Sequence, residues 1–130
     1  MSRARINNII RDYAESIGYN YDTGVVPTAL SGGMAFPAIF WNAPDVKWSD
    51  SKALWEYPSK LYIIADAGEQ DITECLDALQ NHALALHRLL QRDARLFTDS
   101  TFTCKPLYGF DNTTTGAIEV TLNIYCDGGC

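Results

Sequence analysis

The chain has 130 residues, of which 47% are hydrophobic and 20% charged, with a formal net charge of −6. This length and composition fit one globular domain, residues 1–130, with a single hydrophobic core. The acidic charge argues against a module that grips DNA or RNA. No stretch approaches the roughly 18 consecutive apolar residues of a membrane span, and the N-terminal segment lacks the apolar region of a signal peptide.

The N-terminal segment has the spacing of an amphipathic helix. Apolar residues recur three and four positions apart from Ile6 to Ile17, which defines one face of a helix. Ser2 can cap the start of this helix, and Gly18 can end it. We expect a short strand over 19–26 to follow, with a bend at 22–24.

The segment 27–58 is rich in proline and glycine. Gly32, Gly33, Pro37, Pro44 and Pro58 disfavour a helix throughout. The runs AFPAIFW and KALWEY can each form a short strand, the first broken by its proline. We therefore predict an extended hairpin or loop excursion over 27–58. Long loops are usually functional or disordered, and three tryptophans argue against disorder.

The second half of the chain has clearer signals. KLYIIADA (60–67) alternates as a strand does. Asp71 can cap a following helix, with Glu74 three residues later, and apolar residues keep helical spacing as far as Leu90. Two strands, 96–108 and 117–126, are then expected around the polar turn GFDNTTTG.

This order of elements is helix, strand, excursion, strand, helix, strand, strand. It is typical of an α+β fold, in which an antiparallel sheet has two helices packed on one face. The excursion over 27–58 is expected to extend from this layer.

The four cysteines raise the question of a metal site or a disulfide, because the chain ends in YCDGGC. In a reducing cytoplasm all four are expected to be free thiols. Cys126 and Cys130 would need two further ligands to bind zinc, and Cys75 and Cys104 stand alone rather than in a pair. We interpret Cys75 and Cys104 as small core residues and Cys126 as the end of a strand, and we predict no metal site.

No catalytic constellation stands out in the sequence. His82 and His87 lie about 140° apart around one helix, so they cannot hold one ion together. Cys75 is about two turns from His82, too far for a hydrogen-bonded pair. SGGM (31–34) lacks the spacing and the lysine of a phosphate-binding loop. The sequence therefore predicts no enzyme and no cofactor.

Three tryptophans, Trp41, Trp48 and Trp55, recur every seven residues. Pro44 excludes a continuous helix through them, so the repeat is not a heptad. Aromatic residues in a loop-rich segment form either a satellite core or a protein–protein contact. Both alternatives stay open, and the three tryptophans are our candidate contact residues.

One segment of the chain resembles a known protein family. The run KLYIIADAGEQDITECLDALQNHALALHRLLQRD, the closing AIEVTLNIYC and the N-terminal RINNIIRDYAESIG resemble the tail-terminator and minor tail (tail-completion) proteins of long-tailed bacteriophages. The resemblance covers residues 1–26 and 60–126, and rests on pattern and length. The excursion has no counterpart in it.

The resemblance implies a structural virion protein without an active site, located in the neck or tail after synthesis in the host cytoplasm. It implies a homo-oligomeric ring, a homohexamer, that caps the tail tube and contacts the tube and the head-side neck proteins. DNA would pass through the ring without specific binding, and no membrane is involved. The alternatives are a head–tail adaptor or stopper of the same neck, and a small cytoplasmic α+β enzyme or ligand-binding domain.

Overall fold

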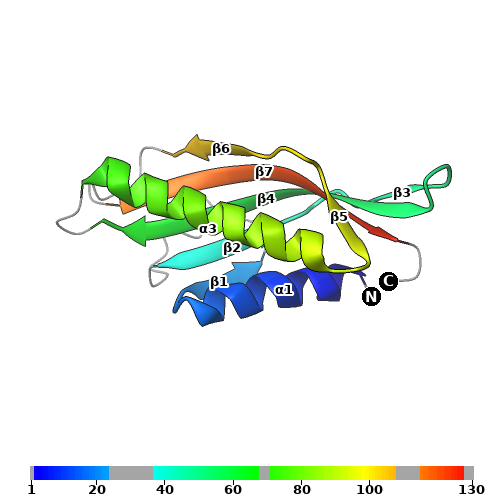
Figure 1. Cartoon of the computed structure of the whole chain (residues 1–130), viewed down its shortest axis with the longest axis horizontal. Coiled ribbons are helices and arrows are strands. Elements are labelled where there is room, and N and C mark those ends of the chain that lie inside the picture. The colour runs from blue at the N-terminus through cyan, green and yellow to red at the C-terminus, as the bar shows by residue number, and fades with distance from the viewer. Residues whose placement is uncertain (1, 24–36, 68–70, 108–114, 128–130) are drawn as a thin grey trace.

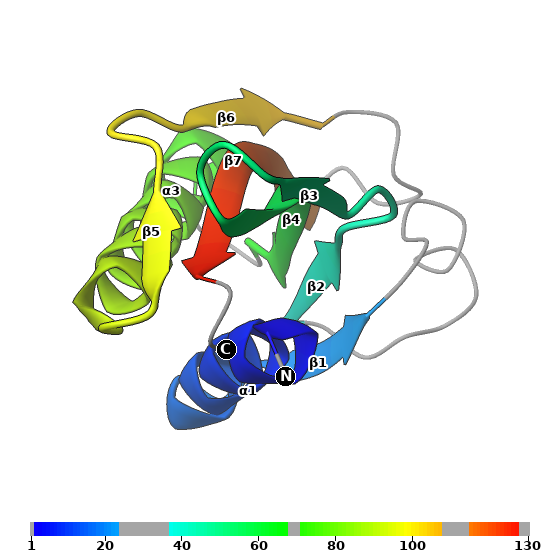
Figure 2. The same ribbon diagram turned by 90° about the vertical axis from the view of Figure 1, so that its right-hand side faces the viewer.

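The computed structural model describes residues 2–23, 37–67, 71–107 and 115–127. In these residues, two helices lie on one face of a seven-stranded sheet (Figures 1 and 2), so the predicted α+β class is confirmed. The elements in chain order are α1 (Ser2–Ser16), β1 (Asn20–Thr23), β2 (Ala38–Asn42), β3 (Lys47–Ser49), β4 (Leu54–Asp66), α3 (Ile72–Arg92), β5 (Leu96–Thr98), β6 (Thr103–Pro106) and β7 (Thr115–Asp127).

The longest pairing in the sheet joins β4 to β7. These antiparallel strands stay in one register from Leu54 opposite Asp127 to Asp66 opposite Thr115. β2 pairs with the other edge of β4, and β1 extends the sheet beyond β2. Because β1 runs parallel to β2, the sheet is mixed rather than wholly antiparallel.

The main core lies between the sheet and the two helices. Alternate residues of β4 and β7, such as Leu61, Ile63 and Val120, point to this side and are buried. A second, smaller cluster lies on the opposite face of the sheet, and it contains Phe40, Ile64 and Ala117 among others. Burial on both faces explains why β2 and the centre of β4 are continuous apolar runs rather than alternating ones.

The predicted end of α1 at Gly18 and the predicted start of α3 at Asp71 are confirmed, whereas Ser2, the predicted cap of α1, is itself the first residue of the helix. After α1, Gly18 has a positive φ of 76°. The Tyr19 amide donates to the Ala14 carbonyl and the Gly18 amide to that of Glu15, which satisfies two carbonyls at the end of the helix. At the start of α3, Asp71 Oδ1 accepts hydrogen bonds from the amide and the hydroxyl of Thr73. The backbone hydrogen bond from Thr73 lowers the pKa of Asp71.

Most of the predicted excursion is part of the sheet. Its residues 37–58 include β2, β3 and the first part of β4, and its residues 27–36 lie outside the described part of the chain. KALWEY and KLYIIADA, expected as separate strands, are one strand that passes through Pro58. Proline is tolerated here because the edge of β4 away from β7 pairs with β3 only up to Glu56 and with β2 only from Lys60.

The prediction of a single strand over 96–108 is wrong. The structure has two short strands there, β5 and β6, both paired with β7. Thr98 lies opposite Ile124 but Thr103 lies opposite Thr121, so the edge strand carries two more residues than β7 between these points. Asp99 lies in this break and accepts hydrogen bonds from Asn123 Nδ2 and the Tyr125 hydroxyl.

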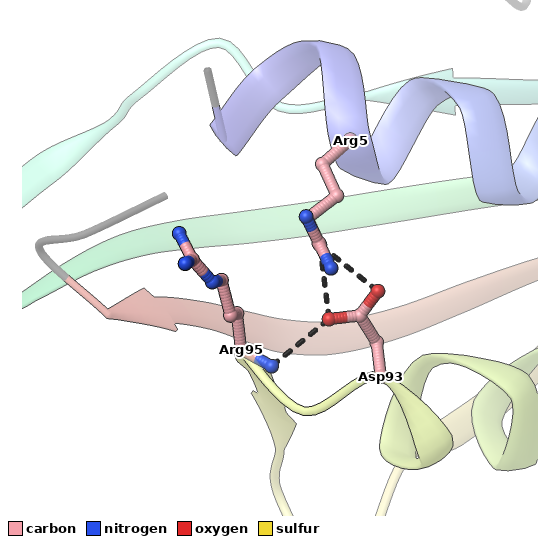
Figure 3. Close-up of polar contacts among 3 residues, drawn as sticks. All are labelled: Arg5, Asp93 and Arg95. Atoms are coloured by element: carbon pink, nitrogen blue, oxygen red, sulfur yellow. Dashed lines mark hydrogen bonds and ion pairs between the residues drawn. The ribbon is translucent and has the colours of Figure 1, made fainter.

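An ion pair connects the two helices near the end where α1 begins and α3 stops. Arg5 Nε donates to both carboxylate oxygens of Asp93, each at 2.9 Å, and the Arg95 amide donates to the same carboxylate (Figure 3). Partial burial alone would raise the pKa of Asp93, but the hydrogen bonds from Arg5 and Arg95 outweigh it and the pKa is lowered.

We expect the Arg5–Asp93 contact to make folding stability depend on pH. A carboxyl group whose pKa is lowered by folding stabilises the protein above its unfolded-state pKa, and this contribution is lost as the pH falls through the folded-state value. Asp93→Asn should therefore cost about 1 kcal/mol at pH 7 and much less at pH 3, because Arg5 is 42% exposed and the pair is screened. Urea unfolding at both pH values measures this, with the exposed Asp12→Asn as a control.

Gly116 allows α3 to approach β7 closely. A methyl group at Gly116 would lie 2.7 Å from Cys75 Sγ, too close for atoms that are not bonded. The small residue therefore decides how deeply the first turn of α3 packs on the sheet.

We predict that Gly116→Ala destabilises the fold by about 1–3 kcal/mol through overpacking. In a Cys75→Ala background the added cost should largely disappear, because the sulfur that the methyl group meets is gone. Urea unfolding of both single variants and the double variant gives the coupling energy. Strictly additive costs would show that this contact does not limit the packing.

Candidate functional site

The sheet extends past the helices at one end as a short hairpin, which we call the aromatic arm (residues 47–56). It contains β3 and the start of β4, and its turn points away from the helical layer (Figures 1 and 2). Trp48 and Trp55 are direct cross-strand partners whose rings meet edge to face, with centroids 5.1 Å apart. They are 43% and 38% exposed, so the arm presents a paired aromatic surface to solvent.

Local hydrogen bonds fix the conformation of the aromatic arm. Trp48 Nε1 donates to Asp50 Oδ1 at 2.6 Å, and the hydroxyls of Ser49 and Ser51 are 3.3 Å apart. Ala53 takes a left-handed φ of 54° as the chain enters β4. Since the indole N–H of Trp48 already has a partner within the arm, the exposed ring of Trp48 offers mainly apolar surface.

The third predicted contact residue, Trp41, lies in the core. Its side chain is 2% exposed, and its Nε1 donates to Ser59 Oγ at 3.0 Å. The Ser59 hydroxyl in turn donates to the carbonyl of Tyr57. The structure therefore brings Trp48 and Trp55 together and separates Trp41 from them. Trp41 is therefore a core residue, and its prediction as a contact residue is wrong. Trp48 and Trp55 still expose surface that a partner could cover.

Sequence reasoning missed Arg3, which lies beside Trp41. The guanidinium carbon is 5.7 Å from the centroid of the Trp41 ring and 5.6 Å from that of Tyr57, and Arg3 Nη2 donates to the Ala43 carbonyl. This is the geometry of a cation–π contact. One feature of the sequence could have pointed to Arg3: it lies in the first turn of a helix, and that turn contains no acidic residue to pair with it.

A pocket of about 730 Å³ opens between α1 and the end of β2. Arg3 is its only charged lining residue among those described, and Asn7 and Asn42 contribute amide groups. Asn7 Oδ1 accepts a hydrogen bond from the Tyr21 hydroxyl, whose pKa is raised by burial. These groups can bind an anionic or polar ligand, and the described lining residues include no histidine, cysteine or carboxylate. The pocket is lined by Arg3, Ala4, Asn7, Thr23, Trp41, Asn42, Ala43 and Pro44.

The two histidines of α3 make separate structural contacts, as their spacing predicted. His82 Nδ1 and the Tyr13 hydroxyl form a 2.7 Å hydrogen bond between α3 and α1. His87 is buried against Phe102, and its Nδ1 lies 3.3 Å from Thr98 Oγ1. Burial lowers the pKa of both histidines, because it disfavours the charged imidazolium.

The cysteines differ from one another in state. Cys75 and Cys104 are free thiols packed against the core, and burial raises the pKa of both. Cys126 is buried at the end of β7, as predicted, but it is disulfide-bonded. The prediction of a free thiol is therefore wrong for Cys126, because it followed from an assumed compartment and not from geometry. Cys130 and the SGGM run (31–34) lie outside the described residues.

Within the described ranges, no three His, Cys, Asp or Glu side chains gather closely enough to hold a metal ion. Neither α1 nor α3, the helices that the structure describes, is long and apolar enough to cross a membrane. A scan against models of known protein families found no match, and a search of curated protein sequences found none either.

Proposed function

We propose that this chain is a structural protein of a bacteriophage neck, a tail terminator that forms a homo-oligomeric ring on the tail tube. The observation that carries the proposal is the aromatic arm, which offers a contact surface outside the folded layer. The helices and the closing strand resemble those of tail-terminator and tail-completion proteins, and this resemblance is the reason for proposing that the chain belongs to a phage particle. In that setting the ring is a hexamer, and it joins the tube to the head.

The arm has the properties of an interface anchor. Tryptophan is strongly enriched among the residues that dominate binding energy at protein interfaces. Trp48 and Trp55 are half-exposed and already ordered against each other. A partner that covers them therefore gains apolar burial without ordering the two side chains first. A neighbouring subunit of the ring is the partner that this function provides.

The charge of the chain supports a passage role for the ring. With a net charge of −6, the protein repels the phosphate backbone rather than holding it. A neck component must let DNA move through during packaging and ejection, and a basic lining would retain it. A head–tail adaptor or stopper would meet the same requirement, and its arm would then contact a different neck protein.

We predict that the purified chain self-associates through the arm. Trp48→Ala should keep the fold, because β4 remains paired with β7, but it should lower the mass of the associated species. Loss of a buried tryptophan anchor costs about 2 kcal/mol or more, a drop in association constant of about thirtyfold. Size-exclusion chromatography with light scattering over a concentration series measures this.

A matched control for this experiment is Phe97→Ala. Phe97 is an exposed aromatic residue on β5, outside the arm, and its loss should leave the associated species intact. A wild-type chain that stays monomeric at every concentration, also in the presence of tail tubes, contradicts the ring. Loss of folded protein in Trp48→Ala would instead assign Trp48 a role in the core.

The pocket beside Arg3 favours a second candidate function, a ligand-binding domain. Its size suits a small molecule, and its one cation has no carboxylate partner among the described residues. If the pocket serves this role, a small carboxylate or phosphate compound should raise the melting temperature of the wild type. Arg3→Gln should abolish that rise, whereas Arg11→Gln, on the same helix outside the pocket, should keep it. A panel without any effect would leave the structural role as the sole candidate.

A further inference from the structure

The outward face of α3 has an ordered pattern of charge. The helix buries one side, which includes Leu79, Ala83 and Leu86, against the sheet. Figure 1 shows α3 crossing the sheet with its other side uncovered by any labelled element. Spacings of three or four residues place six exposed residues along the middle of that other side. We call them the α3 stripe: Glu74, Asp77, Asn81, Leu84, Arg88 and Arg92.

All four acidic and basic residues of α3 belong to the stripe. Glu74 and Asp77 lie in the N-terminal part, and Arg88 and Arg92 in the C-terminal part. At 100° per residue the four fall within a sector of about 60° around the helix axis. The helix dipole accounts for the sign at each end. It does not account for their alignment, because exposed positions outside the sector, such as Thr73 and Gln80, are uncharged.

Among the residues that the structure describes, these charges have no partner of opposite sign. Glu74 and Arg92 are about 27 Å apart along the helix, and no ion pair in the described residues involves any of the four. Their nearest neighbours on the stripe are like charges, three or four residues away, which destabilise a helix by a few tenths of a kcal/mol. Within the described part of the chain, the alignment therefore gives the isolated molecule no favourable ion pair.

A second copy of the same helix, turned antiparallel, would pair every charge. The midpoint between Glu74 and Arg92 is residue 83, and the midpoint between Asp77 and Arg88 lies between 82 and 83. Both kinds of pair can thus form in one register, each of them twice. Contact of one patch with itself in this way is the arrangement at a two-fold axis.

The centre of the stripe suits such an axis. Leu84 is 37% exposed and lies within two residues of the midpoint, and Asn81 lies at a similar distance on the other side. In the antiparallel register each Leu84 packs beside Asn81 of the other copy. The contact then has a small apolar centre with charged pairs at both ends, which is the usual arrangement of a protein interface.

We propose that the α3 stripe is a self-association surface, which binds the same stripe of a second copy antiparallel across a two-fold axis. This contact is separate from the aromatic arm and does not require the ring. Exposed ion pairs each contribute little, so the dimer is weak and loses affinity as salt screens the charges. It is significant where copies are concentrated, as at an assembly site.

Charge reversal tests the proposal directly. One variant carries Glu74→Arg and Asp77→Arg, and the other carries Arg88→Glu and Arg92→Glu, so that each stripe has a single sign. Sedimentation equilibrium at low ionic strength should show self-association reduced by about tenfold or more in each variant. An equimolar mixture of the two should form a heterodimer at least as readily as the wild type forms a dimer.

Three further arms complete the experiment. Asp12→Arg, an exposed change on α1, should leave the dimer unchanged. Arg88→Gln with Arg92→Gln removes charge without reversing it, and it should weaken the dimer if a reversed variant fails to fold. Trp48→Ala should abolish larger species and keep the salt-sensitive dimer, which separates this contact from the ring. A wild-type dimer insensitive to salt and to all stripe variants, or a chain with no dimer at low ionic strength, overturns the proposal.

Discussion

The structure depends on the register between β4 and β7. Thirteen residues of each strand pair without interruption, and every other strand except β1 attaches to one of the two. The same register turns Leu61, Ile63 and Val120 toward the helices. The first residues of β4 lie beyond the N-terminal start of α1 (Figure 1), so the base of the aromatic arm is held by β7 and its turn is left outside the layer.

The local elements were predictable and the long-range pairings were not. Helical spacing and capping residues located α1 and α3, since these features act over a few residues. Alternation predicted β7 for the same reason. By contrast, two expected strands join through Pro58 because β3 and β2 leave a gap along the edge of β4. The break at Asp99 arises because the edge formed by β5 and β6 has two more residues than the stretch of β7 opposite it. Pairing partners far apart in the sequence decide both.

The candidate contact surface shows the same division. An aromatic cluster in a proline-rich segment suggested either core or contact, and the structure buries Trp41 while it leaves Trp48 and Trp55 partly exposed. Trp48 and Trp55 meet because a polar turn returns the chain on itself, while Trp41 is on β2 under Arg3. Arg3 and the α3 stripe could not be located by motif, since their meaning depends on which side of each helix the sheet covers.

The central claim is that the aromatic arm is buried between subunits. Tryptophan fluorescence along a dilution series of the wild type tests it most directly, because Trp41 is already buried and the α3 stripe contains no tryptophan. As the protein associates, the emission should shift to shorter wavelength and quenching by acrylamide should decrease. Association to a ring-sized species with an unchanged spectrum and unchanged quenching would contradict the claim.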